Sequence, residues 1–296
     1  MCLLAIALGV SSRWPLVIAS NRDEFRDRPT LPLSVWTTLG GVTLVSGRDL
    51  RAGGTWMGCT TGGRVALLTN VREPDAAPAA LSRGELPLRW LEGQLETAEF
   101  LATTDATSYG GCNLLIGDVL KGDWAWASNR GNLAGCAAPL KSVLLPSGWQ
   151  SMPLLPGIYG LSNALLDTPW PKTQALKTAM QAAVAEAEKD AHESALTNIL
   201  WTALANRQRA NVDNLPVTGV TASMEHALSS ALIDMPERPN GGYGTLSSTL
   251  MWLAAKTETE AGALTANICE KTIHAAAHET NGSDQQMVRL TWPLRG

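Results

Sequence analysis

The order of the expected secondary-structure elements limits the folds open to this chain. Short apolar runs bounded by turn residues indicate strands from Cys2 to Asn163, two longer helices follow up to Asn206, and strands return from Gly244. No strand–helix–strand unit repeats along the chain, and a doubly wound parallel sheet requires such units. We therefore expect an α+β fold in which two antiparallel sheets stack face to face with helices outside.

The bounds of the expected elements follow from the apolar runs and the turn residues between them. Strands are expected at Cys2–Leu8, Leu16–Ser20, Thr43–Ser46, Thr55–Cys59, Arg64–Val71, Asn113–Asp118, Trp124–Ser128, Ile158–Asn163, Gly244–Ala255, Leu264–His274 and Gln286–Trp292. Helices are expected at Gly84–Glu92, at Glu96–Thr103, from a Thr168 cap with Pro169 in the first position to Lys189, at Glu193–Asn206 and at Glu225–Ala231.

Composition and charge restrict the class of protein. The 296 residues are 45% hydrophobic and 17% charged, and the absence of repeats or long linkers favours one globular domain over residues 1–296. A net charge of −4 disfavours nucleic-acid partners. The longest apolar run, Cys2–Val10, is too short to cross a bilayer and lacks a basic leader, so we expect no transmembrane segment and a cytoplasmic location.

Five scattered cysteines without a C-x-x-C pair disfavour a disulfide scaffold or a zinc finger and fit a reducing compartment. His274 and His278 have the i, i+4 spacing of a metal pair but lack the glutamate of a zinc hydrolase, so we expect no metal site. We also expect no required cofactor. The 11 tryptophans either pack the core or partly line a pocket for a flat ligand.

Cys2 is the first candidate for chemistry. Removal of Met1 would leave a thiol and an α-amine on one residue, and an amine with an ordinary pKa near ~8 is a suitable general base for its own thiol. The alternative is that Cys2 is a small hydrophobic residue of a buried strand.

A run of polar residues follows the second expected strand. Asn21, Arg22, Asp23 and Glu24 come directly after Ser20, and a hairpin would bring them close to Cys2. An arginine beside a thiol lowers its pKa and can bind a carboxylate or phosphate. The two acids could orient Arg22 through a bidentate bridge. The alternative is a solvated turn.

These segments resemble the NRDE family, also called the transport-and-Golgi-organisation-2 family. The resemblance rests on Met1-Cys2, on Asn21-Arg22-Asp23-Glu24-Phe25 with Arg28-Pro29, and on further segments spread over nearly the whole chain. These are Gly53-Gly54-Thr55-Trp56-Met57-Gly58, Ala66-Leu67-Leu68-Thr69-Asn70, Ser82-Arg83-Gly84-Glu85, Asn129-Arg130-Gly131, Gly157-Ile158-Tyr159-Gly160-Leu161-Ser162-Asn163-Ala164, Thr168-Pro169-Trp170-Pro171-Lys172, Tyr243-Gly244-Thr245 and Ser247-Ser248-Thr249.

The family is similar to N-terminal-nucleophile (Ntn) hydrolases, which implies a four-layer αββα sandwich. By similarity to the cysteine amidohydrolases of that superfamily, Cys2 would be the nucleophile with its amine as the base. Arg22 would flank the thiol, and Asn70 and Asn163 would supply oxyanion-hole donors. Asn21, Arg22, Asp23, Glu24 and Trp56 are the candidate ligand-binding residues.

Two classes of function stay open under this resemblance. One is a hydrolase of a non-peptide amide or a thioester. The other is a non-catalytic intracellular carrier for haem or acyl-coenzyme A. The family is also associated with haem trafficking and with acyl-coenzyme A or lipid metabolism. Leu246 stands where family members commonly have an arginine, which removes one cation from the expected site and favours the carrier.

Overall fold

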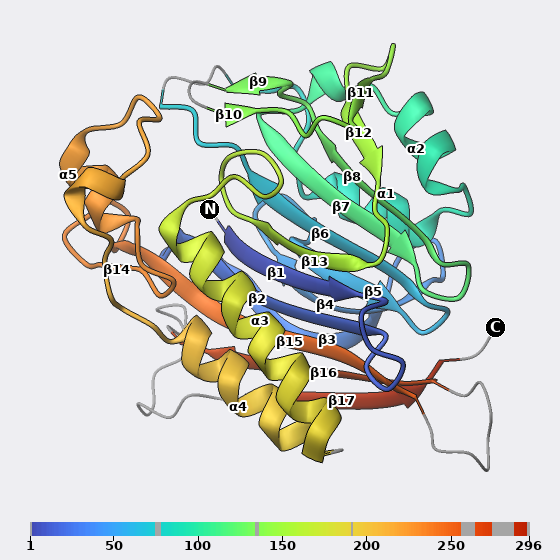
Figure 1. Cartoon of the computed structure of the whole chain (residues 1–296). Coiled ribbons are helices and arrows are strands. Elements are labelled where there is room, and N and C mark those ends of the chain that lie inside the picture. Colours follow the sequence, from blue (N-terminus) through green and yellow to red (C-terminus); the bar gives the residue numbers. More distant parts are fainter. Residues whose placement is uncertain are drawn as a thin grey trace.

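Two large antiparallel sheets are stacked on each other, with helices on both outer faces (Figure 1). This computed structural model describes residues 2–74, 78–133, 136–190, 192–255, 264–273 and 287–294. The expected αββα sandwich is therefore confirmed for the described chain. Met1, His274 and His278 lie outside these residues.

The first sheet carries both ends of the chain. Its order is β13 (Gly157–Leu161), β1 (Cys2–Leu8), β2 (Leu16–Phe25), β15 (Tyr243–Ala255), β16 (Leu264–Thr272) and β17 (Met287–Pro293), with β14 (Asp234–Met235) also paired to β15. β1 and β2 therefore form the expected hairpin at the centre of the sheet.

The strands of the second sheet come from residues 30–153. Its order is β11 (Val143–Leu144), β12 (Gln150–Pro153), β8 (Asp123–Ser128), β7 (Cys112–Asp118), β6 (Arg64–Asn70), β5 (Met57–Thr60), β4 (Thr43–Asp49) and β3 (Thr30–Thr37). A separate two-stranded ribbon joins β9 (Asn132–Leu133) to β10 (Cys136–Ala137).

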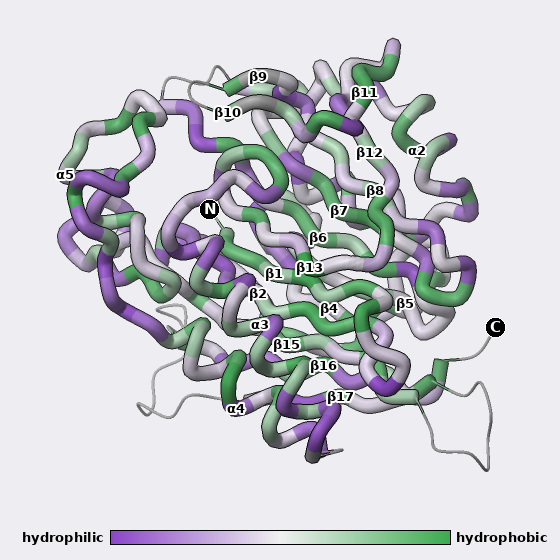
Figure 2. Tube along the Cα trace, in the orientation of Figure 1, coloured by the Kyte–Doolittle hydropathy of each residue, from purple (hydrophilic) through white to green (hydrophobic). Residues whose placement is uncertain are grey.

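Alternating side chains along β1 explain how the layers stack. Leu4, Ile6 and Leu8 pack against the second sheet, whereas Leu3 and Ala5 pack under the helices of the first sheet. A strand buried on both faces reads as the continuous apolar run seen at the start of the sequence, and Figure 2 shows β1 as hydrophobic while the segments around α5 are largely hydrophilic.

The helices cover the two outer faces. α3 (Pro171–Asp190) and α4 (Glu193–Leu204) lie over the first sheet, and α1 (Glu85–Glu92) and α2 (Thr97–Thr103) lie over the second. The short helix α5 (Ala222–Ala227) and two 3₁₀ turns, Ala106–Ser108 and Val212–Asn214, complete the described helical segments.

Two boundaries differ from the sequence expectation in ways that affect the site. β2 continues through Phe25 because β15 pairs with it along its whole length, so the polar run is a buried strand and not a turn. α3 begins at Pro171, two residues later than expected, because Thr168 closes a local turn by donating to the Leu165 carbonyl at 2.8 Å. Pro171 therefore takes the first helical position in place of Pro169.

A third difference is a strand that the sequence did not indicate. β3 pairs with β4 at the edge of the second sheet and alternates half-buried with exposed residues over most of its length. Such an edge strand carries no continuous apolar signal.

Candidate functional site

Cys2 and Arg22 lie directly opposite each other in the β1–β2 ladder. Cys2 is 9% exposed, and burial raises the pKa of its thiol; Asp23 adds to this increase, while Arg22 and a hydrogen bond from the Asp23 main chain oppose it. The expected proximity is therefore present, and Arg22 lowers the pKa of the thiol as expected, but desolvation outweighs the arginine and the net pKa is raised. Cys2 is a thiol in the resting protein.

Arg22 is held by an aromatic ring of the other sheet. Its guanidinium carbon lies 4.1 Å from the centroid of the Trp56 ring, just before β5. Trp56 reaches this place because Gly47 on β4 has no side chain: a Cβ there would lie 2.4 Å from the ring. Nη1 of Arg22 is buried without a hydrogen-bond partner. The guanidinium thus offers a donor inside the molecule next to Cys2.

Asp23 points to the opposite face of β2. Its Oδ1 accepts a hydrogen bond from Thr245 Oγ1 at 2.7 Å, and its main-chain carbonyl accepts one from the Tyr243 hydroxyl at 3.2 Å. Burial raises the pKa of this carboxyl, although Lys172 opposes the increase.

The other two residues of the polar run, Asn21 and Glu24, have hydrogen-bond partners. The Asn21 amide donates to the carbonyls of Leu204 and Ala231 at 2.9 and 2.8 Å and thereby ties β2 to the end of α4. Glu24 accepts from the Phe25 amide at 2.9 Å and lies 4.0 Å from Arg28. Within the described chain the expected bridge from the acids to Arg22 does not form.

Asn70 and Asn163 lie side by side next to Cys2. Nδ2 of Asn163 donates to the Asn70 carbonyl at 2.8 Å, and Ser162 donates to the Cys2 carbonyl at 3.0 Å. Asn163 is thus bonded to the end of β6, and its neighbour Ser162 is bonded to the start of β1. The described contact of Asn70 is made by its main chain, while its side chain is half-buried.

A group of buried charged residues next to Cys2 escaped the sequence analysis. Arg72 and Glu225 form an ion pair with side chains only 4% and 3% exposed, and Arg72 stacks 4.6 Å from the Trp170 ring. Lys172, in the first turn of α3, is 5% exposed. The Thr168–Lys172 segment contained the signal for Lys172 and for Trp170, the ring on which Arg72 stacks, but the place of this segment in the fold depends on how α3 packs.

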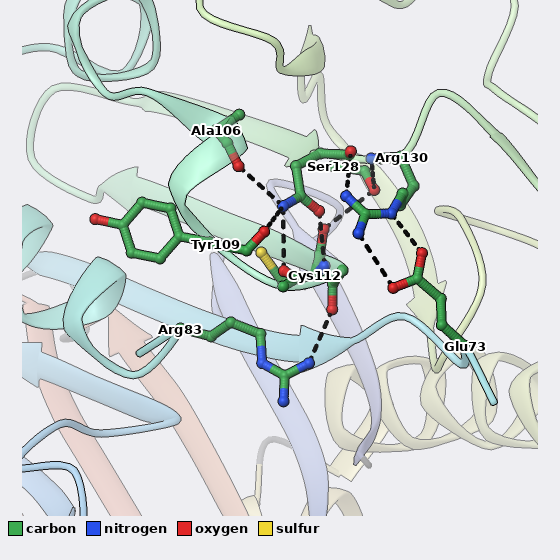
Figure 3. Close-up of polar contacts among 10 residues, drawn as sticks. Glu73, Arg83, Ala106, Tyr109, Cys112, Ser128 and Arg130 are labelled. Carbon is green, nitrogen blue, oxygen red and sulfur yellow. Dashed lines mark hydrogen bonds and ion pairs between the residues drawn. The ribbon is translucent and has the colours of Figure 1, made fainter. Parts of the chain in front are cut away.

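The segment after β6 is fixed by the Asn129-Arg130-Gly131 motif. Arg130 pairs with Glu73, and Asn129 accepts from the Cys112 amide at 2.8 Å; Figure 3 shows Arg130 beside Glu73 and close to Cys112. These contacts hold the chain between Asn70 and Glu73.

Leu246 lies at an irregularity of β15. The pairing register with β2 shifts between Thr245 and Ser247, and Leu246 is buried at the shift. No side-chain cation stands at this position. The glycine pair before Trp56 serves the fold: a Cβ on Gly54 would lie 2.4 Å from the main chain of Gly84.

Among the described residues, no cluster of three or more histidine, cysteine or acidic side chains is arranged to hold a metal ion. In the same part of the chain, no helix combines the length and apolar character needed to cross a bilayer. Arg22 Nη1, Arg72 Nε and Lys172 Nζ are buried cationic donors without a hydrogen-bond partner in the described part of the chain.

The family of this chain follows from sequence comparison. A family model described as Transport and Golgi organisation 2 matches residues 1–275. The chain belongs to this family. It is 35% identical over 193 residues to the mouse Transport and Golgi organization 2 homolog, covering 62% of this chain and 63% of that protein. It is 36% identical over 166 residues to the human homolog, covering 53% of each. The matched region thus spans between about half and two thirds of these relatives.

Comparison with solved structures found two of low similarity. One is the Caenorhabditis elegans ortholog of N-acylethanolamine-hydrolyzing acid amidase, with a TM-score of 0.45 and 13% identity over 84% of this chain and 92% of that one. The other is a mutant conjugated bile acid hydrolase from Clostridium perfringens, with a TM-score of 0.42 and 9% identity over 99% and 97%. Identities this low identify no substrate for this family member.

Proposed function

We propose that this chain is a hydrolase of a non-peptide amide or a thioester, with Cys2 as the nucleophile after removal of Met1. The observation that carries the proposal is the position of Cys2. It begins a central strand, faces Arg22 across the ladder and contacts Ser162 next to Asn163. A nucleophile, a cation and an amide donor thus converge at one end of the sheet.

The raised thiol pKa determines the first step. Since Cys2 rests as a thiol, the attack requires a base at the moment of bond formation. The Cys2 α-amine takes the thiol proton while Sγ bonds to the carbonyl carbon. The amine then gives this proton to the leaving nitrogen or sulfur as that bond breaks. Water hydrolyses the resulting acyl-cysteine and releases a carboxylic acid and the free thiol.

Asn163 supports the charge that develops on the carbonyl oxygen. A carboxamide nitrogen has two hydrogens, and the bond to Asn70 uses one. The second is the donor that we assign to the oxyanion. Loss of one oxyanion-hole donor typically lowers kcat by roughly 10²–10³, so Asn163→Ala should lower turnover by that amount.

The proposal is tested by turnover of a panel of N-acyl amides and acyl thioesters with protein that begins at residue 2. Cys2→Ala should abolish hydrolysis of whichever compound the wild type cleaves. Asn198→Ala, at an exposed position of α4, is a control that should leave turnover unchanged. Full hydrolysis by the Cys2→Ala protein would overturn the proposal.

The buried Nη1 of Arg22 supports a second candidate function. A guanidinium next to an aromatic ring can bind the propionates of haem or the phosphates of acyl-coenzyme A without chemistry. Titration with haem and with palmitoyl-coenzyme A distinguishes the candidates. A carrier should bind one of them stoichiometrically and lose affinity on Arg22→Ala, whereas an enzyme should mainly lose turnover. No binding of either ligand would exclude the carrier.

A further inference from the structure

A cavity of about 410 Å³ lies between the start of α3 and the end of α4. It is lined by Lys172, Ala175 and Ala179 on α3, by Ala203 on α4 and by residues of the segment 206–211 that follows. Both helices cover the outer face of the first sheet (Figure 1). The volume is in the range of small-molecule binding sites.

Hydrogen bonds hold the wall that residues 206–211 form. The Leu232 amide donates to the Asn206 carbonyl at 2.9 Å, and the Ala210 amide donates to Ser229 Oγ at 2.9 Å. Ser229 and Ala231 also line the cavity. The cavity is therefore built by the fold itself and needs no ligand to form it.

The charged residues of the cavity have one sign. They are Lys172 and Arg209, and no aspartate or glutamate is among the described residues that line it. Arg209 is exposed, whereas Lys172 is only 5% exposed and its Nζ is buried without a hydrogen-bond partner. Burial of an ammonium without a partner costs free energy, and an anion bound beside it would recover part of this cost.

The position of Lys172 on α3 adds to the positive potential. The residue belongs to the first turn of a 20-residue helix, and the N-terminus of a long helix favours an anion over a second cation. Burial lowers the pKa of Lys172 to about 8; Asp23 opposes this decrease but accepts no hydrogen bond from Nζ. The side chain is therefore mostly charged at pH 7.

The cavity becomes apolar along α3. Ala175 and Ala179 follow Lys172 by three and seven positions, so the three residues lie on the same side of the helix. The helix rises by about 10 Å from Lys172 to Ala179. Ala203 and Ala231 add further apolar surface. A ligand that matches this lining has an anionic head and an apolar chain.

We propose that this cavity binds an amphiphilic organic anion. Its carboxylate or phosphate lies at Lys172 and Arg209, and its apolar chain lies along Ala175 and Ala179. On binding, the flexible side chain of Lys172 turns its ammonium group toward the anion, which supplies the hydrogen-bond acceptor that Nζ lacks.

The proposed site is separate from Cys2. Asn21 on β2 donates to the carbonyl of Ala231, which lines the cavity. The neighbouring Arg22 points to the other face of β2, where it stacks on Trp56 and lies opposite Cys2. A ligand in the cavity therefore lies on the other side of the first sheet from Cys2, and the inference does not rest on the proposed function.

Calorimetric titration of the full chain with octanoate and with octyl phosphate tests the proposal and distinguishes the two headgroups. Octanol and octylammonium are controls that lack the negative charge. We expect saturable binding of at least one anion at one site per chain, and binding of the controls weaker by about tenfold or more. Absence of saturable binding of both anions, or equal binding of the controls, would overturn the proposal.

Variants at the cationic end test the place of the anion. Lys172→Met should weaken binding by about tenfold and Arg209→Gln by about threefold, whereas Lys172→Arg keeps the charge and should stay within about threefold of the wild type. Lys177→Met is the matched control, because Lys177 lies on the same helix, pairs with Asp167 at 2.6 Å and does not line the cavity. Its affinity should be unchanged.

A variant at the apolar end tests the place of the chain. Ala179→Phe fills this end without a change of charge and should weaken binding by about tenfold. Together with Arg209→Gln it decides the matter even if the Lys172→Met protein does not fold. Unchanged affinity in Lys172→Met or in Ala179→Phe would overturn the proposal.

Arg22→Ala separates this site from the one at Cys2. The variant should bind the anion as the wild type does, and loss of binding would place the ligand at Cys2 and overturn the inference. A failed hydrolysis panel would remove the proposed function but leave this site in place, because Cys2 takes no part in the binding.

Discussion

Cys2 lies directly opposite Arg22 across the β1–β2 ladder, at the end of the central hairpin of the first sheet. The guanidinium of Arg22 in turn stacks on the ring of Trp56, the residue directly before β5 of the second sheet. The thiol is therefore fixed relative to both sheets. Its environment can be probed by substitutions whose expected effects have opposite signs.

The first prediction concerns the reactivity of the Cys2 thiol. Arg22 lowers its pKa and Asp23 raises it, within a net increase due to burial. In protein that begins at residue 2, Arg22→Gln should slow alkylation at pH 8 and Asp23→Asn should accelerate it, each by roughly threefold to tenfold. Iodoacetamide labelling mapped to the N-terminal peptide measures both rates.

Internal and matched controls accompany this measurement. Burial raises the pKa of Cys59 and of Cys112 to about 12, so these thiols should stay unlabelled while the protein is folded. Arg51→Gln removes an exposed arginine and should leave the Cys2 rate unchanged. Equal rates in the Arg22 and Asp23 variants would contradict the electrostatic account.

The second prediction concerns the contact between Arg22 and Trp56. A partly desolvated cation–π pair contributes about 0.5–2 kcal/mol. A double-mutant cycle with Arg22→Ala and Trp56→Ala should give a coupling free energy in this range, measured by urea unfolding. Arg48 stacks on Trp36 at 4.3 Å and provides a second cycle at a half-buried pair. Strict additivity of the Arg22 and Trp56 effects would show that the stack is not held in solution.

The third prediction concerns the buried Arg72–Glu225 pair. Removing one partner of a buried pair leaves an uncompensated charge and typically costs about 3–5 kcal/mol. Glu225→Gln should therefore lower the free energy of unfolding by that amount. Replacing both residues with hydrophobic ones should restore part of it. Glu186→Gln breaks the exposed Lys189–Glu186 pair and should cost less than about 1 kcal/mol. Similar losses for Glu186 and Glu225 would contradict the burial of the inner pair.

The fourth prediction concerns Glu270 and the pH dependence of stability. Its carboxylate accepts from the Leu33 amide at 2.8 Å and from Thr249 at 3.1 Å, but burial outweighs these bonds and raises its pKa above the ordinary 4.5. A raised carboxyl pKa means that the folded state holds the proton more tightly than the unfolded state. The resulting stabilisation is complete below pH 4.5 and is lost as the pH rises through the folded pKa.

Glu270→Gln removes this dependence. The stability of the wild type relative to the variant should fall as the pH rises above 4.5 and level off once the folded carboxyl is ionised, as measured by urea unfolding at a series of pH values. Glu99→Gln is a control at an exposed helical position. A relative stability that rises over this range would show that Glu270 is held as a favourable anion.

The hairpin explains why part of the site could be predicted from sequence. Cys2 and Arg22 belong to two strands joined by a short turn, and an apolar run followed by a second one defines their pairing. The layer order followed from the missing strand–helix–strand repeat. Both inferences depend on local patterns that a sequence records directly.

The remaining features depend on long-range packing. Lys172 reaches the site only because α3 lies across the end of β1, and Arg72 finds Glu225 at a distance of 153 positions along the chain. The net pKa of Cys2 likewise depends on burial, which its neighbouring residues in sequence do not reveal. The sequence analysis ended this strand at Ser20, five residues before its end at Phe25. The extra residues are held in the strand by β15, which comes from the other end of the chain.

The mass of the untagged protein, before and after exposure to an acyl substrate from the hydrolysis panel, tests the central claim most directly. We expect two results. Before exposure, the mass should be lower than that of the full sequence by one methionine. After exposure, it should rise by one acyl group, which maps to the peptide that begins with Cys2 and is absent from the Cys2→Ala protein. A retained Met1, or an acyl group that persists after Cys2→Ala, would contradict the assignment of Cys2 as an N-terminal nucleophile.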